Sequence, residues 1–126
     1  MSPELLQQRI DAARQWGMQI CQQMIAATSK LGFNDSLIPL IEFDAASFEL
    51  DTDPYTQKQA LKGTWYRNHQ HKVGEIIFHV DGSFYAEYDV VQPHPKNKIW
   101  FVESITAWGR AGNIKTDARL LEMQDA

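Results

Sequence analysis

Ionisable and hydroxyl-bearing side chains gather in residues 73–91, whose sequence is V-G-E-I-I-F-H-V-D-G-S-F-Y-A-E-Y-D-V-V. If this segment forms a hairpin, His79, Tyr85 and Glu87 share one of its faces. A histidine beside a carboxylate can take up or release a proton near neutral pH, which is general acid or base chemistry. These three are therefore the candidate catalytic residues. A solvated outer face of a sheet is the alternative interpretation of the same pattern.

A pair of histidines, His69-x-His71, could hold a metal ion. In extended chain, side chains two residues apart point the same way, so both imidazoles would face one ion. Zinc sites use at least three protein ligands, however, and no third ligand follows at a fixed spacing. The pair is therefore interpreted as two exposed loop histidines, and we predict no metal site and no cofactor.

The sequence carries none of the short motifs that mark common enzyme classes. It has no glycine-rich phosphate loop, no Ser-His-Asp order and no Cys-x-x-Cys pair. A non-enzymatic protein is therefore the favoured interpretation, and enzymatic activity is kept as the alternative.

Aromatic residues suggest a second kind of site. Phe, Trp and Tyr make up 11% of the chain, and many fall on adjacent predicted strands. Exposed Trp and Tyr often dominate protein contacts, because they bury a large area and keep a polar end. The candidate binding residues are Trp65, His94, Trp100 and Trp108. His94 is included because Pro93-His94-Pro95 should form a stiff, exposed projection.

Length and composition indicate one ordinary globular domain, residues 1–126, with 44% hydrophobic and 22% charged residues. A net charge of −4 argues against a nucleic-acid partner, because phosphate contacts need clustered Lys and Arg. No stretch approaches the roughly 18 apolar residues of a membrane span, and the N-terminus lacks a signal-peptide pattern. The single cysteine, Cys21, has no partner for an internal disulfide. We therefore expect a cytoplasmic protein that does not bind membranes.

The elements that would position these residues begin with the hairpin itself. Apolar and polar residues alternate in both halves of 73–91, which is typical of half-buried strands. A two-residue turn would pair Phe78 with Tyr85 and mix apolar and acidic side chains on one face. A three-residue loop with Gly82 in the bulge position pairs Phe78 with Phe84 instead and keeps one face apolar. Because a one-residue slip moves every side chain to the other face, the apolar pattern favours the three-residue loop.

A long helix is predicted for residues 3–31. Its apolar side chains recur every three or four residues and form one stripe: Leu6, Ile10, Ala13, Gly17, Ile20, Met24, Ala27 and Leu31. Such a helix would be about 40 Å long, whereas an ordinary sheet measures about 20 Å along its strands. The helix therefore either lies diagonally across a twisted sheet, or overhangs it and pairs with a second copy to form a homodimer. Gly17 would permit that close approach, or would make room for a tryptophan.

Further strands are predicted at 46–51, 57–67, 99–108 and 114–120. A helical turn at 57–61 and a C-terminal helix from Thr116 are the alternatives, and most of 33–60 shows no clear period. The predicted fold class is α+β: a long N-terminal helix packed on an antiparallel β-meander of about five strands, in two layers, with a flat or curved sheet. A curved version would resemble the cone-shaped nuclear-transport-factor-2-like fold in outline, although no motif carries that resemblance to individual residues.

These observations favour a non-enzymatic interaction or binding module, with a protein partner preferred over nucleic acid. An acidic domain that covers a basic partner is one version of this hypothesis. The alternative is a cone-shaped domain that binds a small molecule, or a small enzyme whose pocket contains His79, Tyr85 and Glu87.

Overall fold

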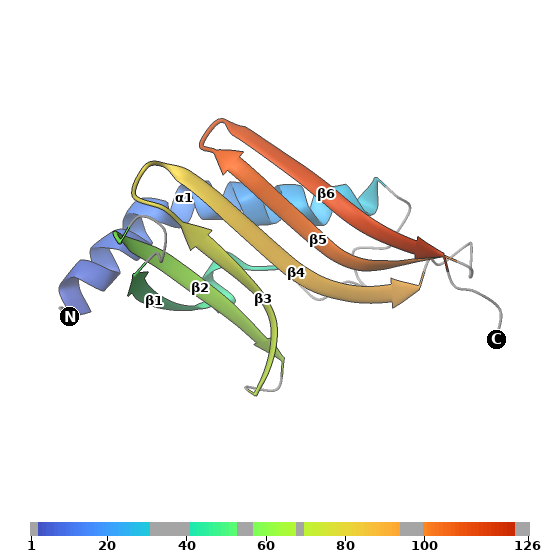
Figure 1. Cartoon of the computed structure of the whole chain (residues 1–126), viewed down its shortest axis with the longest axis horizontal. Helices are drawn as coiled ribbons and strands as arrows, with labels where there is room; N and C mark the ends of the chain where they lie inside the picture. The colour runs from blue at the N-terminus through green and yellow to red at the C-terminus, as the bar shows by residue number, and fades with distance from the viewer. Residues whose placement is uncertain (1–2, 31–40, 53–56, 68–69, 94–99, 123–126) are drawn as a thin grey trace.

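The structure, a computed structural model, describes residues 3–30, 41–52, 57–67, 70–93 and 100–122. It has two layers, with one helix lying across a six-stranded sheet (Figure 1). The helix α1 is Pro3–Ser29, and a single 3₁₀ turn, η2, is Phe43–Ala45. The strands follow in chain order: β1 Ser47–Thr52, β2 Gln59–Arg67, β3 His71–Phe78, β4 Ser83–Pro93, β5 Trp100–Arg110 and β6 Asn113–Glu122.

The six strands form an antiparallel meander in the order β1-β2-β3-β4-β5-β6, and the sheet is open. The predicted fold class is therefore confirmed, with six strands in place of about five. Both helical alternatives are wrong, because β2 begins at Gln59 and β6 continues through Thr116 as a strand. In β6, Lys115 and Asp117 are exposed while Thr116 and Ala118 are partly buried, which is the alternation that the sequence predicted.

The β3–β4 hairpin has the predicted three-residue loop. Phe78 pairs with Phe84, and the backbone N–H of His79 donates to the carbonyl of Ser83 at 2.9 Å. Gly82 has a φ of +91°, a left-handed conformation that glycine adopts readily. Its N–H donates to the carbonyl of His79 at 3.1 Å and closes the loop. The apolar pattern therefore predicted the register correctly.

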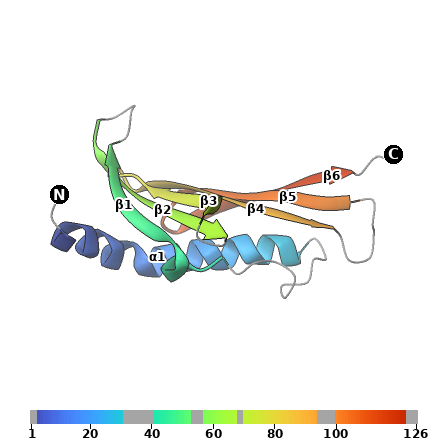
Figure 2. The same ribbon diagram turned by 90° about the horizontal axis from the view of Figure 1, so that it is seen from below.

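The strand pairing places most of the buried apolar side chains on one face of the sheet, here called the inner face. Its fully or almost fully buried members lie on the four central strands: Leu61, Trp65, Ile76, Phe78, Phe84, Ala86, Tyr88, Ile105 and Ala107. Figure 2 shows α1 running along this face, with the other face turned away from the helix.

Helix α1 packs its apolar stripe onto the inner face. Ile20 and Met24 are fully buried, and Trp16 meets the rings of Phe78 and Phe84 edge-on, at 5.1 and 5.4 Å between ring centres. The helix approaches β1 and β2 at one side of the sheet and β5 and β6 at the other. The helix therefore packs along its length against the sheet of its own chain. The buried part of its apolar stripe is not available to a second copy.

Gly17 marks the closest contact between α1 and the rest of the chain. A Cβ at this position would overlap the ring of Phe43, which lies in η2. The same ring contacts Phe48 of β1, at 4.8 Å between ring centres. Trp65 of β2 holds the turn from the other side, because its indole N–H donates to the carbonyl of Glu42 at 2.7 Å. Gly17 thus makes room for a phenylalanine of its own chain, and the expectation of a neighbouring tryptophan is wrong.

We expect Gly17→Ala to lower the free energy of unfolding by about 1–3 kcal/mol, because the added methyl group overpacks a filled core. The sign is diagnostic, since the same change at an open helix position stabilises by about 0.5–1 kcal/mol. Urea unfolding gives the value. The loss in free energy of unfolding should be smaller in a Phe43→Leu background, because leucine replaces the ring that the methyl group meets by a smaller side chain. A more stable Gly17→Ala protein would show that this packing is absent.

Cys21 belongs to the same core, with 3% of its surface exposed. Burial raises the pKa of its thiol to about 12, so the reactive thiolate is scarce at neutral pH. We expect Ellman's reagent at pH 8 to modify Cys21 at least about a hundredfold more slowly in the folded protein than in urea. Ser47→Cys, on the exposed start of β1, provides the matched control and should add one fast thiol. Fast labelling of the unmodified chain would contradict the burial of Cys21.

Candidate functional site

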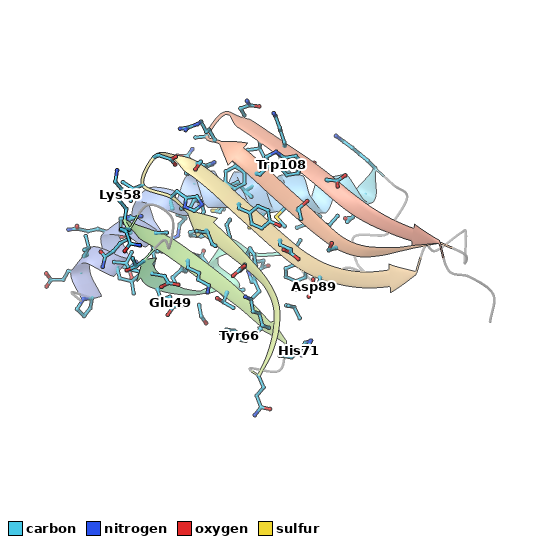
Figure 3. All side chains as sticks on the ribbon, viewed as in Figure 1. Glu49, Lys58, Tyr66, His71, Asp89 and Trp108 are labelled. Carbon is cyan, nitrogen blue, oxygen red and sulfur yellow. The ribbon has the colours of Figure 1, made fainter. Side chains whose placement is uncertain are left out.

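The face of the sheet opposite α1, here called the outer face, is not covered by any other element in the described part of the chain (Figure 2). An apolar row crosses its centre, made of Ile77, Tyr85 and Trp108. These three residues are direct cross-strand neighbours on β3, β4 and β5. Tyr85 is 37% exposed and Trp108 is 38% exposed, which is unusual for large aromatic side chains on an otherwise polar sheet face. Figure 3 shows Trp108 on this face.

An acidic cluster, Glu75, Glu87 and Asp89, lies beside the apolar row. Glu75 and Glu87 are directly opposite each other on β3 and β4. With Lys72 and Gly74 the three carboxylates line a small hollow of about 130 Å³. Like charges directly opposite each other destabilise a sheet, so the fold itself gains nothing from this pair.

The charges of the acidic cluster are only partly neutralised. The ammonium group of Lys72 lies 3.0 Å from a Glu75 oxygen, and that of Lys62 lies 3.8 Å from it. Among the described residues, no cation lies within 4 Å of Glu87 or Asp89. Within the described part of the chain, two carboxylates of the cluster thus stay available to a cation from outside.

Tyr85 and Glu87 are in contact, with the tyrosine hydroxyl donating to the carboxylate at 3.1 Å. Partial burial raises the pKa of Tyr85 above its ordinary value of 10.0, and the hydrogen bond to Glu87 raises it further. The negative charges of Glu87 and Glu75 act in the same direction. Tyr85 therefore keeps its proton at neutral pH and serves as a hydrogen-bond donor, not as a base.

His79, the third candidate catalytic residue, lies at the hairpin loop, two residues beyond Ile77. It is partly buried and lines a groove between α1 and the hairpin, together with Arg9 and Trp16. Tyr85 and Glu87 do not line that groove. Contact is thus shown for two of the three candidates, on the outer face, while the histidine borders a different hollow.

The other sequence-predicted site residues have separate positions. Trp65 is 3% exposed and belongs to the core, so its assignment to a binding surface is wrong. Trp108 is exposed as expected, and His71 is exposed at the start of β3. Trp100 lies in β5, but its side chain is outside the described part of the structure, as are His69 and His94. Within the described residues, no three His, Cys, Asp or Glu side chains come together to hold a metal ion.

Sequence reasoning missed that Trp108 joins Tyr85 in one row. A usable signal was present, because Ile105 and Ala107 are the small or aliphatic residues of β5 and should face the core. Alternation from them places Thr106 and Trp108 on the opposite face. The missing information was the register between β4 and β5, which no tight turn determines.

Comparison with known proteins provides no further guide. No protein-family model, characterised protein or solved structure was found that matches this chain. In the part of the chain that the structure describes, no helix has the length and apolar character needed to cross a membrane.

We expect Glu87→Gln to lower the pKa of Tyr85 toward 10.0, because it removes a negative charge and weakens the hydrogen bond that holds the phenol proton. Difference titration of phenolate absorbance against Tyr85→Phe measures this pKa. Glu49→Gln, the same charge change on exposed β1, should leave it unchanged. Equal effects of the two variants would contradict a specific Tyr85–Glu87 contact.

The same shift has a consequence for stability at high pH. The folded state holds the Tyr85 proton more tightly than the unfolded chain does. The stabilisation that this proton contributes to the folded state is therefore complete below pH 10.0. It is lost as the pH rises through the raised pKa of the folded state. Tyr85→Phe should therefore lose less of its free energy of unfolding than the unmodified protein as the pH rises above 10.0 and through the raised pKa of Tyr85.

Proposed function

We propose that this protein is a non-enzymatic interaction module that binds a basic segment of a partner protein through the outer face of its sheet. The observation that supports this most strongly is the row of partly buried Ile77 and exposed Tyr85 and Trp108 beside the carboxylates of Glu87 and Asp89. Aromatic side chains provide contact area, and carboxylates without a bound cation select Arg and Lys.

The spacing of the two carboxylates supports an extended partner segment. Glu87 and Asp89 are two residues apart on β4, and therefore roughly 7 Å apart along one face. Basic residues at alternate positions of an extended peptide have the same spacing. The stems of these residues would lie on the apolar row, and a guanidinium within about 6 Å of an aromatic ring gains a further cation–π attraction.

The geometry supports binding over catalysis. The hollow at the acidic cluster, about 130 Å³, is smaller than the roughly 300–1,000 Å³ of typical small-molecule sites. Tyr85 holds its proton, and its hydroxyl is the hydrogen-bond partner of Glu87. Tyr85 is therefore not a base at neutral pH.

Charge also favours the proposed class of partner. The carboxylates of Glu87 and Asp89 would repel nucleic-acid phosphates, and two outer faces placed together would oppose like charges. A partner protein with a basic segment meets neither problem. A homodimer and a cytoplasmic location stay predictions from the sequence.

A ten-residue peptide with arginine at alternate positions is a suitable probe, with the citrulline version as its uncharged counterpart. We expect the arginine peptide to bind more tightly, with binding that weakens as salt is added. NMR shift changes should centre on Tyr85, Glu87 and Trp108. Trp108→Ala and Glu87→Gln should each weaken binding at least about fivefold, or about 1 kcal/mol.

Glu4→Gln is the matched control, because it removes the same charge from the exposed first turn of α1, on the other side of the sheet. Its affinity for the arginine peptide should stay within about twofold of the unmodified protein. Equal losses for Glu4→Gln and Glu87→Gln would show that only the net charge of the protein matters. Equal binding of the citrulline peptide would contradict recognition of cations.

A further inference from the structure

A second hollow lies on the helix side of the sheet, apart from the outer face. It is a groove of about 340 Å³ between the first half of α1 and the end of the β3–β4 hairpin. Its apolar lining comes from three separate parts of the chain: Ala13 and Trp16 of α1, Leu61 of β2, and Phe78 and Val80 of the β3–β4 hairpin. Val80 is 56% exposed, so the groove is open to solvent at the hairpin loop. Its volume lies at the lower end of the range for small-molecule sites.

Arg9 provides a positive charge at this groove. Its guanidinium donates one long hydrogen bond, 3.4 Å, to the carbonyl of Gln59. Among the described residues, no carboxylate lies within 4 Å of it. Arg14 on the same helix is different, because it is paired with Asp11 at 2.9 Å and Asp44 at 3.1 Å. Arg9 is thus a cation beside an apolar surface, and it has no negative partner in the described segments of the chain.

The polar groups of the groove are mainly hydrogen-bond donors. Its lining side chains include no carboxylate, amide or hydroxyl group, and its polar members are Arg9, Trp16 and His79. The indole N–H of Trp16 is buried, and it has no acceptor within the described part of the protein. Buried polar groups are nearly always paired, so the Trp16 N–H calls for a partner. Arg9 and Trp16 carry hydrogen-bond donors only, and an anionic ligand would supply an acceptor for them.

We propose that this groove binds a small amphipathic carboxylate, with its alkyl or aryl body on the apolar lining and its carboxylate on Arg9. Arg binds carboxylates in bidentate geometry, and the apolar body would cover surface of Trp16 and Val80 that water now contacts. A neutral ligand would leave Arg9 unpaired, and a cationic one would be repelled. This site is independent of the outer face, so either proposal can fail without the other.

The experiment uses decanoate as the probe, below its micelle concentration, with decyltrimethylammonium as the cation of equal chain length. Isothermal titration gives affinity and stoichiometry, and NMR shifts locate the site. We expect one decanoate per chain, with shifts centred on Arg9, Trp16 and Val80. Arg9→Gln should weaken binding at least tenfold. Arg14→Gln, the same charge change outside the groove, should stay within about twofold.

Ala12→Leu tests the location without removing a charge. Ala12 lines the groove but is exposed, so the larger side chain fills the groove and leaves the core intact. It should weaken decanoate at least about fivefold while circular dichroism stays unchanged. No decanoate binding, equal losses for Arg9→Gln and Arg14→Gln, or equal affinity for decyltrimethylammonium would each overturn the proposal.

Discussion

The contact between the Phe43 ring and Gly17 sets the distance between helix and sheet, and the rest of the structure depends on it. The ring occupies the space that the side chain of any residue other than glycine would fill at position 17. The hydrogen bond from Trp65 to the carbonyl of Glu42 fixes the turn that carries this ring. Because the ring also contacts Phe48, these contacts together link α1, η2, β1 and β2. This packing keeps α1 on the inner face, and no described element covers the outer face.

Both candidate sites follow from this layering. On the outer face, the pleat of the strands directs Ile77, Tyr85 and Trp108 outward from rigid positions, so the aromatic groups are presented without ordering a loop. On the helix side, small Ala13 separates bulky Ile10 and Trp16, and leaves space between the helix and the end of the hairpin. One sheet thus carries an acidic, aromatic surface on one side and a cationic, apolar groove on the other.

Much of the fold could be predicted from the sequence, because apolar periodicity determines which face each residue takes. The Phe78–Phe84 pairing is the clearest example, since a slip by one residue would expose the whole apolar set. The Gly17–Phe43 contact could not be predicted, because 33–60 shows no period that would place Phe43. Trp65 was misassigned because a buried and an exposed tryptophan look alike in a strand. The groove brings together Arg9 and Val80, which are far apart in the sequence. Local spacing of residues cannot predict a contact between such distant positions.

The position of α1 has a consequence for how the chain is made. The helix leaves the ribosome before the strands, yet α1 contacts β6, and Gln23 and Ala26 of its second half border one hollow with Thr116 and Ala118 of β6. The meander itself can pair strand by strand as it emerges, because each strand bonds to its neighbour in sequence. The contacts of α1 with β5 and β6 therefore form only after these two strands have been made. A nascent chain that stops before β5 lacks two of the four strands that α1 approaches, so premature termination leaves apolar helix surface that chaperones and proteases would recognise.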